Sequence, residues 1–194
     1  MRKAIRHRLG MLPFTELAGR QCDRCTTNGG TRFIEDPDHF HSCAPNHRTL
    51  ALPRHNNIVQ VLMDLGRAVG YTCSREPNLH VRPEGQSSMS SKNYNSHADI
   101  LMLKHNQRIY IDVTVTRPTS VTNMRTQKSS LVPLNSTIGR SKAKHAKYDE
   151  LARVNNYDLV PFVMESYGGF GIKATRLLTR LSTQSPTFTP AAFL

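Results

Sequence analysis

Apolar positions recur at helical spacing in the second quarter of the chain. They predict a helix over about 57–69, with Asn56 or Asn57 as its N-terminal cap and Gly70 just past its end. The apolar stripe, at i, i+4, i+7 and i+11, consists of Ile58, Leu62, Leu65 and Val69.

The following segments favour strands. Tyr71–Glu76 is typical of a short strand that Pro77 would end. His97–Leu103 and Arg108–Thr116 flank a turn at 105–107, so they predict a β-hairpin. The second of these strands alternates cleanly: one face carries Ile109, Ile111, Val113 and Val115, and the other carries Tyr110, Asp112, Thr114 and Thr116.

A connector containing Pro118 and Pro133 separates the hairpin from three more expected elements. These are a basic helix over Arg140–Val154, a strand over Asp158–Met164 and, after a glycine-rich turn, a helix over 172–181. Pro161 cannot donate a hydrogen bond within its strand, which favours a place at the sheet edge. The order helix, strand, strand, strand, helix, strand, helix predicts an α/β fold, with helices on the faces of a mixed sheet.

Composition divides the 194-residue chain into three parts. Residues 1–50 form a basic lead-in and a Cys/His-rich module, 51–182 form the α/β domain, and 183–194 form a tail that is expected to fray. A serine-rich stretch over 82–96 is typical of a loop inside the domain. A chain of this length buries roughly 70% of its unfolded surface and needs no disulfide scaffold.

The charge of the chain favours a polyanionic partner. Lysine and arginine number 26 against 14 acidic residues, which gives a formal net charge of +12. DNA is the expected partner of such a surface, RNA is an alternative, and a basic surface that only keeps the protein soluble is the remaining interpretation. No apolar run approaches the roughly 20 residues that span a bilayer, so a membrane partner is not expected.

The first 14 residues bear on localisation. Four cations precede only a short apolar stretch, which disfavours a secretory signal. The absence of acidic residues there is compatible with a mitochondrial transit segment. A nuclear location suits a DNA partner and is the first expectation, with the mitochondrion as the alternative.

The cysteine spacing favours metal binding over disulfides. Cys22 and Cys25 would present two thiolates to one metal, and His39 and Cys43, at i and i+4, would complete a closed, structural Zn²⁺ site. Cys73 is expected to be a buried strand thiol outside the set. Rival ligands are His41 and His47, and partners for a ligand histidine are Asp36 and Asp38. The alternative is a chance spacing of ordinary buried cysteines.

Two acidic residues on neighbouring expected strands are the candidate catalytic pair. Asp99 and Asp112 could hold one Mg²⁺ or Mn²⁺, which prefers oxygen ligands and keeps several waters. Such an ion activates a water and stabilises the leaving oxygen of a phosphodiester. Glu76, at a strand end, could supply a third carboxylate. In the alternative interpretation, Asp112 faces solvent and Asp99 pairs with a lysine.

The basic helix offers lysines for the same chemistry. Lys144, Lys147 and Tyr148 share one helical face, and a lysine near metal-binding carboxylates can position or deprotonate the attacking water. A helix N-terminus preceded by an arginine could also bind a phosphate. The expected DNA contacts are Arg54, His55, Arg140, Lys142 and Tyr148. The alternatives are a solvated basic face and a capping segment with incidental charges.

Taken in order, these motifs resemble the C-terminal restriction-like endonuclease domain of site-specific non-LTR retrotransposons, a branch of the PD-(D/E)XK nucleases. The motifs are the Cys-Cys-His-Cys knuckle, Arg54-His55-Asn56, Glu76-Pro77, Ala98-Asp99-Ile100, Asp112-Val113-Thr114-Val115 and Lys144-x2-Lys147-Tyr148. The resemblance covers about residues 5–180. It implies a restriction-endonuclease-like mixed sheet over 51–182 and a small N-terminal zinc knuckle.

The resemblance also implies divalent-metal-dependent hydrolysis of target DNA. In this family two aspartates bind the ion and a lysine completes the site, roles that pass to Asp99, Asp112 and either Lys144 or Lys147. Ala98 replaces the usual proline, and no lysine stands two residues after Asp112, because in this branch the lysine lies on the following helix. The alternative is a catalytically inactive, zinc-stabilised nucleic-acid-binding module, either domesticated or a relic.

Overall fold

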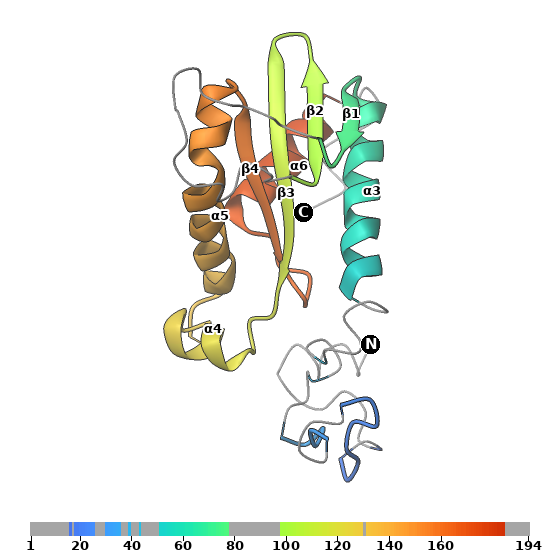
Figure 1. Ribbon diagram of the computed structural model, residues 1–194, viewed down its shortest axis with the longest axis vertical. Coiled ribbons are helices and arrows are strands. Elements are labelled where there is room, and N and C mark those ends of the chain that lie inside the picture. The colour runs from blue at the N-terminus through green and yellow to red at the C-terminus, as the bar shows by residue number, and fades with distance from the viewer. Residues whose placement is uncertain are drawn as a thin grey trace, which may run out of the picture.

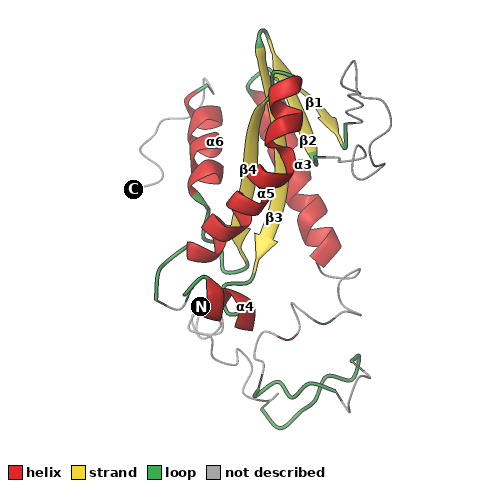
Figure 2. Ribbon diagram, turned by 60° about the vertical axis from the view of Figure 1, so that its left-hand side comes forward, coloured by secondary structure: helices red, strands yellow, loops and turns green. Residues whose placement is uncertain are grey.

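A computed structural model describes most of the α/β region and part of the N-terminal module. The described residues are 16, 18–25, 30–35, 39, 43, 51–77, 98–129 and 131–184. Four strands form one mixed sheet with helices on both faces, as Figures 1 and 2 show, so the expected mixed α/β architecture is confirmed. The serine-rich stretch 82–96 lies outside the described residues.

The elements follow the expected order with one addition. They are α3 (Leu52–Ala68), β1 (Thr72–Arg75), β2 (Ile100–Lys104), β3 (Gln107–Thr116), α4 (Val121–Thr126), α5 (Asn135–Val154), β4 (Asp158–Glu165) and α6 (Ile172–Thr183). Among the described residues, no helix is long and apolar enough to cross a membrane.

The sheet has the strand order β1-β2-β3-β4. β1, β2 and β3 pair antiparallel, and Lys104 lies opposite Gln107 where the predicted hairpin turns. β4 then pairs parallel to β3 as the last strand of this sheet, with Pro161 opposite Asp112 and an isolated bridge from Met164 to Phe170 on its other side. The prediction that Pro161 marks an edge strand is therefore confirmed, because a residue without an N–H is tolerated there.

β3 is buried on both faces. Ile109, Ile111 and Val113 pack into the larger core with α3 and α6. The other face, which carries Tyr110, packs beneath α5 against Tyr148, and the two rings meet edge to face at 6.0 Å. The polar face of this strand is therefore covered as fully as the apolar face.

The start of α3 differs from the prediction. The helix begins at Leu52, so Asn56 and Asn57 lie inside it and the capping prediction is wrong. Pro53 stands in the first turn, where its missing N–H has no intrahelical partner to lose. At the other end Gly70 adopts a φ of 88° and its N–H bonds to the Arg67 carbonyl, as expected of a glycine just past a helix.

Three corrections concern the second half of the chain. The connector before α5 contains the short helix α4, whose first turn is capped by Ser120 Oγ accepting the Asn123 N–H. α5 itself begins at Asn135, five residues before the predicted start. α6 continues to Thr183, two residues past its predicted end at 181 and one residue into the segment 183–194 that was expected to fray.

Candidate functional site

The N-terminal module brings four predicted ligands together. Donor atoms of Cys22, Cys25, His39 and Cys43 all lie within 4.8 Å of one another. A tetrahedral zinc with bonds of about 2.3 Å to sulfur requires sulfurs about 3.8 Å apart. Cys22 Sγ and Cys43 Sγ are 3.7 Å apart, and Cys25 Sγ lies 3.0 Å from His39 Nε2. This Cys3His cluster could therefore bind a metal such as zinc.

Hydrogen bonds favour the thiolate at this cluster. Burial raises the pKa of the Cys22 thiol, but bonds from the backbone N–H groups of Arg24 and Cys25 and from neighbouring thiols outweigh it, so the pKa is lowered. A thiolate is the form that binds a metal. The rivals His41 and His47, and the acids Asp36 and Asp38, lie outside the described residues. Cys73 lies on β1, half-buried.

Asp112 is a buried carboxylate in the middle of the sheet. Its residue is 4% exposed, so the alternative in which it faces solvent is wrong. Lys144 Nζ reaches across from α5 to within 2.8 Å of Asp112 Oδ2. Thr114, two residues along the same face, donates a 3.3 Å hydrogen bond to the same oxygen. A buried carboxylate needs such partners, because leaving it unpaired away from water is costly.

Asp99 lies directly before β2. Its Oδ2 accepts a 2.6 Å hydrogen bond from the Val113 N–H, and its Oδ1 lies 3.3 Å from His55 Nε2. The hydrogen bond to Asp99 raises the pKa of His55, although burial opposes the shift. The partner of Asp99 is thus a histidine on α3 and not the lysine of the alternative interpretation.

The two aspartates are anchored at neighbouring positions of β3. Val113, which binds Asp99, directly follows Asp112 in the strand. Burial chiefly, and then the charges of both aspartates among its neighbours, raise the pKa of Tyr110 to about 12. The Tyr110 hydroxyl accepts a 2.7 Å hydrogen bond from the Ala98 N–H, which ties the start of β2 to β3. His55 approaches this pair from α3 and Lys144 from α5.

Glu76 does not join the carboxylate pair. Its backbone N–H bonds to the Asp99 carbonyl, but its side chain is exposed and lies 3.6 Å from Arg75 Nε. Among the described residues, the Cys3His cluster is the one group of three or more candidate ligands with mutually close donor atoms. A Mg²⁺ ion needs only one or two protein carboxylates when waters and substrate phosphate oxygens complete its coordination.

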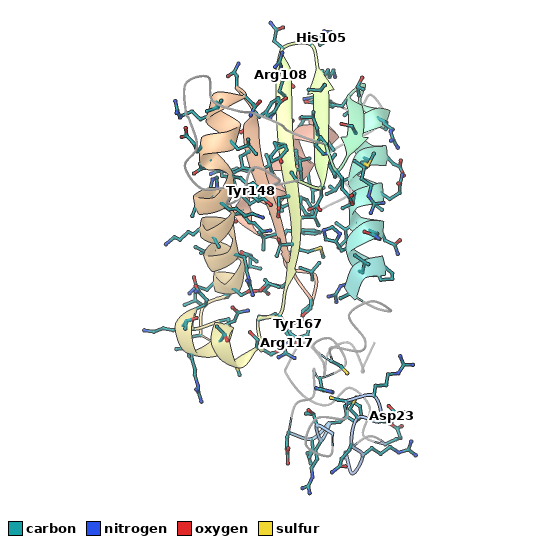
Figure 3. The ribbon with its side chains drawn as sticks, viewed as in Figure 1. Asp23, His105, Arg108, Arg117, Tyr148 and Tyr167 are labelled. Carbon is teal, nitrogen blue, oxygen red and sulfur yellow. The ribbon has the colours of Figure 1, made fainter. Side chains whose placement is uncertain are left out.

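The two candidate lysines occupy different environments. Lys144 contacts Asp112, whereas Lys147 Nζ donates to the Tyr148 hydroxyl at 2.9 Å and lies 4.6 Å from its ring centre. Tyr148 is 2% exposed and its ring points into the molecule from α5 (Figure 3). The expectation that Tyr148 contacts DNA is therefore wrong, because the ring packs under the helix.

The other expected DNA contacts divide between two surfaces. Arg140 and Lys142 are exposed on α5. Arg54 is half-buried and lines an apolar groove of about 560 Å³ between α3, β4 and α6. Burial there lowers the pKa of the Arg54 guanidinium. His55 was also expected to contact a phosphate, but its side chain contacts the Asp99 carboxylate.

Sequence reasoning missed two features of this site. The contact between His55 and Asp99 joins residues 44 positions apart, and no pattern in the chain predicts it. The contact between Thr114 and Asp112 could have been predicted, because alternation places both residues on one face of β3. No model of a known protein family matches the chain, and no curated protein matches it at a significant level.

Proposed function

We propose that the chain is a divalent-metal-dependent DNA endonuclease of retrotransposon type that hydrolyses phosphodiester bonds, with a structural zinc knuckle at its N-terminus. The observation that carries the proposal is the buried Asp112 paired with Lys144, directly before Val113, whose N–H binds the Asp99 carboxylate. The order and spacing of the motifs, from the Cys3His cluster to α5, support the same function.

The aspartates, the lysine and the histidine of the site have different proposed roles in hydrolysis. Asp99 and Asp112 would hold Mg²⁺ or Mn²⁺, which supplies Lewis-acid activation of a water and of the scissile phosphate. The Lys144 ammonium group would orient the attacking water or stabilise the negative charge that develops on a phosphate oxygen. His55 keeps the Asp99 carboxylate oriented.

The charge of the chain suits a duplex substrate. From 113 to 148 the sequence contains seven lysines and arginines and no acidic residue. Arg140 and Lys142 in this segment are exposed on α5, the helix that carries Lys144. Phosphate contacts of this kind position a duplex without specifying its sequence.

The test is cleavage of supercoiled and branched DNA by the pure chain with Mg²⁺, Mn²⁺ or EDTA. We expect metal-dependent nicking that Asp112→Asn abolishes, because the amide keeps the shape of the side chain but loses the charge that binds the ion. Asp158→Asn, which alters an exposed acid on β4, is the matched control and should cut normally. Equal DNA binding by all three proteins would locate the defect in the chemistry.

The rival function is a zinc-stabilised nucleic-acid-binding module without catalysis. Ala98 at the position of the usual proline favours it. It predicts salt-dependent DNA binding with no cleavage in either metal and no effect of Asp112→Asn on affinity. That outcome would reject the nuclease.

A further inference from the structure

The connection between α4 and α5 exposes an apolar tip. Leu131 is 77% exposed and Val132 46% exposed, and Pro133 beside them is exposed as well. Backbone bonds define the tip: the N–H groups of Leu131 and Val132 both donate to the Lys128 carbonyl. Leu134 then adopts a φ of 61°, which turns the chain into α5. The apolar side chains are therefore presented on a hydrogen-bonded turn.

The surroundings of this tip are basic. Arg125 on α4, Lys128 in the connection and Arg140 on α5 are all exposed, and no acidic residue lies between 113 and 148. Glu165 of β4 reaches the start of α5, where its carboxylate accepts a 2.8 Å hydrogen bond from Ser136 Oγ. An apolar protein partner would have to bury these cations, whereas a polyanion complements them.

The tip lies directly before α5, the helix that carries the proposed catalytic lysine. α4 and the first turn of α5 sit at one end of the sheet, past the last residues of β3 (Figure 1). The nine helical steps from Asn135 to Lys144 span about 14 Å at 1.5 Å per residue. That length corresponds to roughly four base-pair steps of 3.4 Å.

We propose that Leu131 and Val132 form a wedge that inserts between base pairs of duplex DNA, while the surrounding cations hold the phosphates on either side. Proteins that kink DNA use apolar side chains of this kind, flanked by lysine and arginine, and unstack a base step. The inference rests on the proposed DNA substrate, but not on cleavage.

The test uses a short duplex with a single central TA step, because such steps kink most easily. One copy carries 2-aminopurine at that step, and another carries a fluorophore at each end. Without divalent metal, the full-length protein should raise the 2-aminopurine fluorescence and shorten the end-to-end distance. Replacing both tip residues, by Leu131→Ser with Val132→Ser, should abolish both signals and weaken binding about tenfold.

The controls separate the wedge from folding and from charge. Ile172→Ser changes an equally exposed apolar residue on α6, 63% exposed, and should leave both signals intact. Leu131→Met keeps an apolar side chain and should retain unstacking. Thermal unfolding of each variant should match that of the unaltered chain, because the tip side chains are exposed.

Each outcome has a distinct meaning. Binding without fluorescence change, or full signals from the double serine variant, would overturn the wedge. Loss of self-association by that variant, measured by sedimentation with DNA binding unchanged, would make the tip a protein interface and also overturn it. Unstacking without any metal-dependent cleavage would keep the wedge and reject the nuclease, whereas cleavage without unstacking would reject the wedge alone.

Discussion

Among single residues, the structure separates two lysines that the sequence left equivalent. Lys144 lies 2.8 Å from Asp112, and Lys147 binds the Tyr148 hydroxyl. We expect Lys144→Ala to lower cleavage by about 10²–10⁴-fold, the usual contribution of a positioned acid–base group. Lys147→Ala should keep cleavage within a few-fold. Single-turnover nicking rates check both variants, and a larger defect from Lys147→Ala would reverse the assignment.

Tyr110 makes the stability of the fold sensitive to alkaline pH. Its pKa is raised from 10.0 to about 12, chiefly by burial, so the folded state keeps the hydroxyl proton to a higher pH than the unfolded state does. This stabilisation is complete below pH 10 and is lost as the pH rises through about 12, up to about 3 kcal/mol.

The variant Tyr110→Phe tests this pH dependence. It should lose about 1 kcal/mol at neutral pH, because the Ala98 N–H loses its acceptor. Its unfolding free energy should then fall less than that of the unaltered chain between pH 9 and pH 11, measured by urea denaturation. Parallel losses in the two proteins would contradict the role of Tyr110.

The residue types of the site were predictable and several of their partners were not. The C-x2-C pair and the acid within an alternating strand are local signals, and the structure assembles the four ligands as spacing predicts. The pairing of His55 with Asp99 depends on how α3 packs against the start of β2, which local sequence does not encode. Tyr148 was misplaced because its helical face alone does not say whether that face meets solvent or the sheet.

At the scale of elements, hydrophobic periodicity found the strands and missed helix starts. The first turn of α5 carries polar residues that are nonetheless buried, namely Ser136 and Thr137. Their hydroxyls bond to Glu165 and to the Leu134 carbonyl, so they need no apolar character. α4 has six residues, too few to display a 3.6-residue period.

The N-terminal module yields a prediction of its own. After exhaustive dialysis we expect about one zinc ion per chain, measured by inductively coupled plasma mass spectrometry. A strong chelator should remove this zinc. Cys22→Ser should abolish zinc binding, because a closed tetrahedral site needs all four ligands. Cys73→Ser is the matched control, since that thiol lies on β1 outside the cluster. Equal zinc content in the two variants would refute the assigned ligands.

At the scale of the whole molecule, burial of β3 on both faces explains how the site is built. The sequence pattern predicted one apolar face and one polar face for this strand. α5 covers the polar face, so Asp112 is withdrawn from solvent and Lys144 is brought to it. This packing follows from the parallel pairing of β3 with β4, since the crossover between parallel strands places α5 on the sheet.

The net charge of +12 predicts how DNA binding responds to salt. Because bound cations release counterions, a plot of log affinity against log salt should have a slope steeper than about −4, as expected for five or more phosphate contacts. Arg140→Gln and Lys142→Gln should each reduce the slope by about one. Arg67→Gln is the control, because Arg67 lies on α3 and pairs with Asp64 at 3.1 Å. Fluorescence anisotropy with a short duplex measures all four proteins, and a slope near zero would show that the basic surface does not bind DNA.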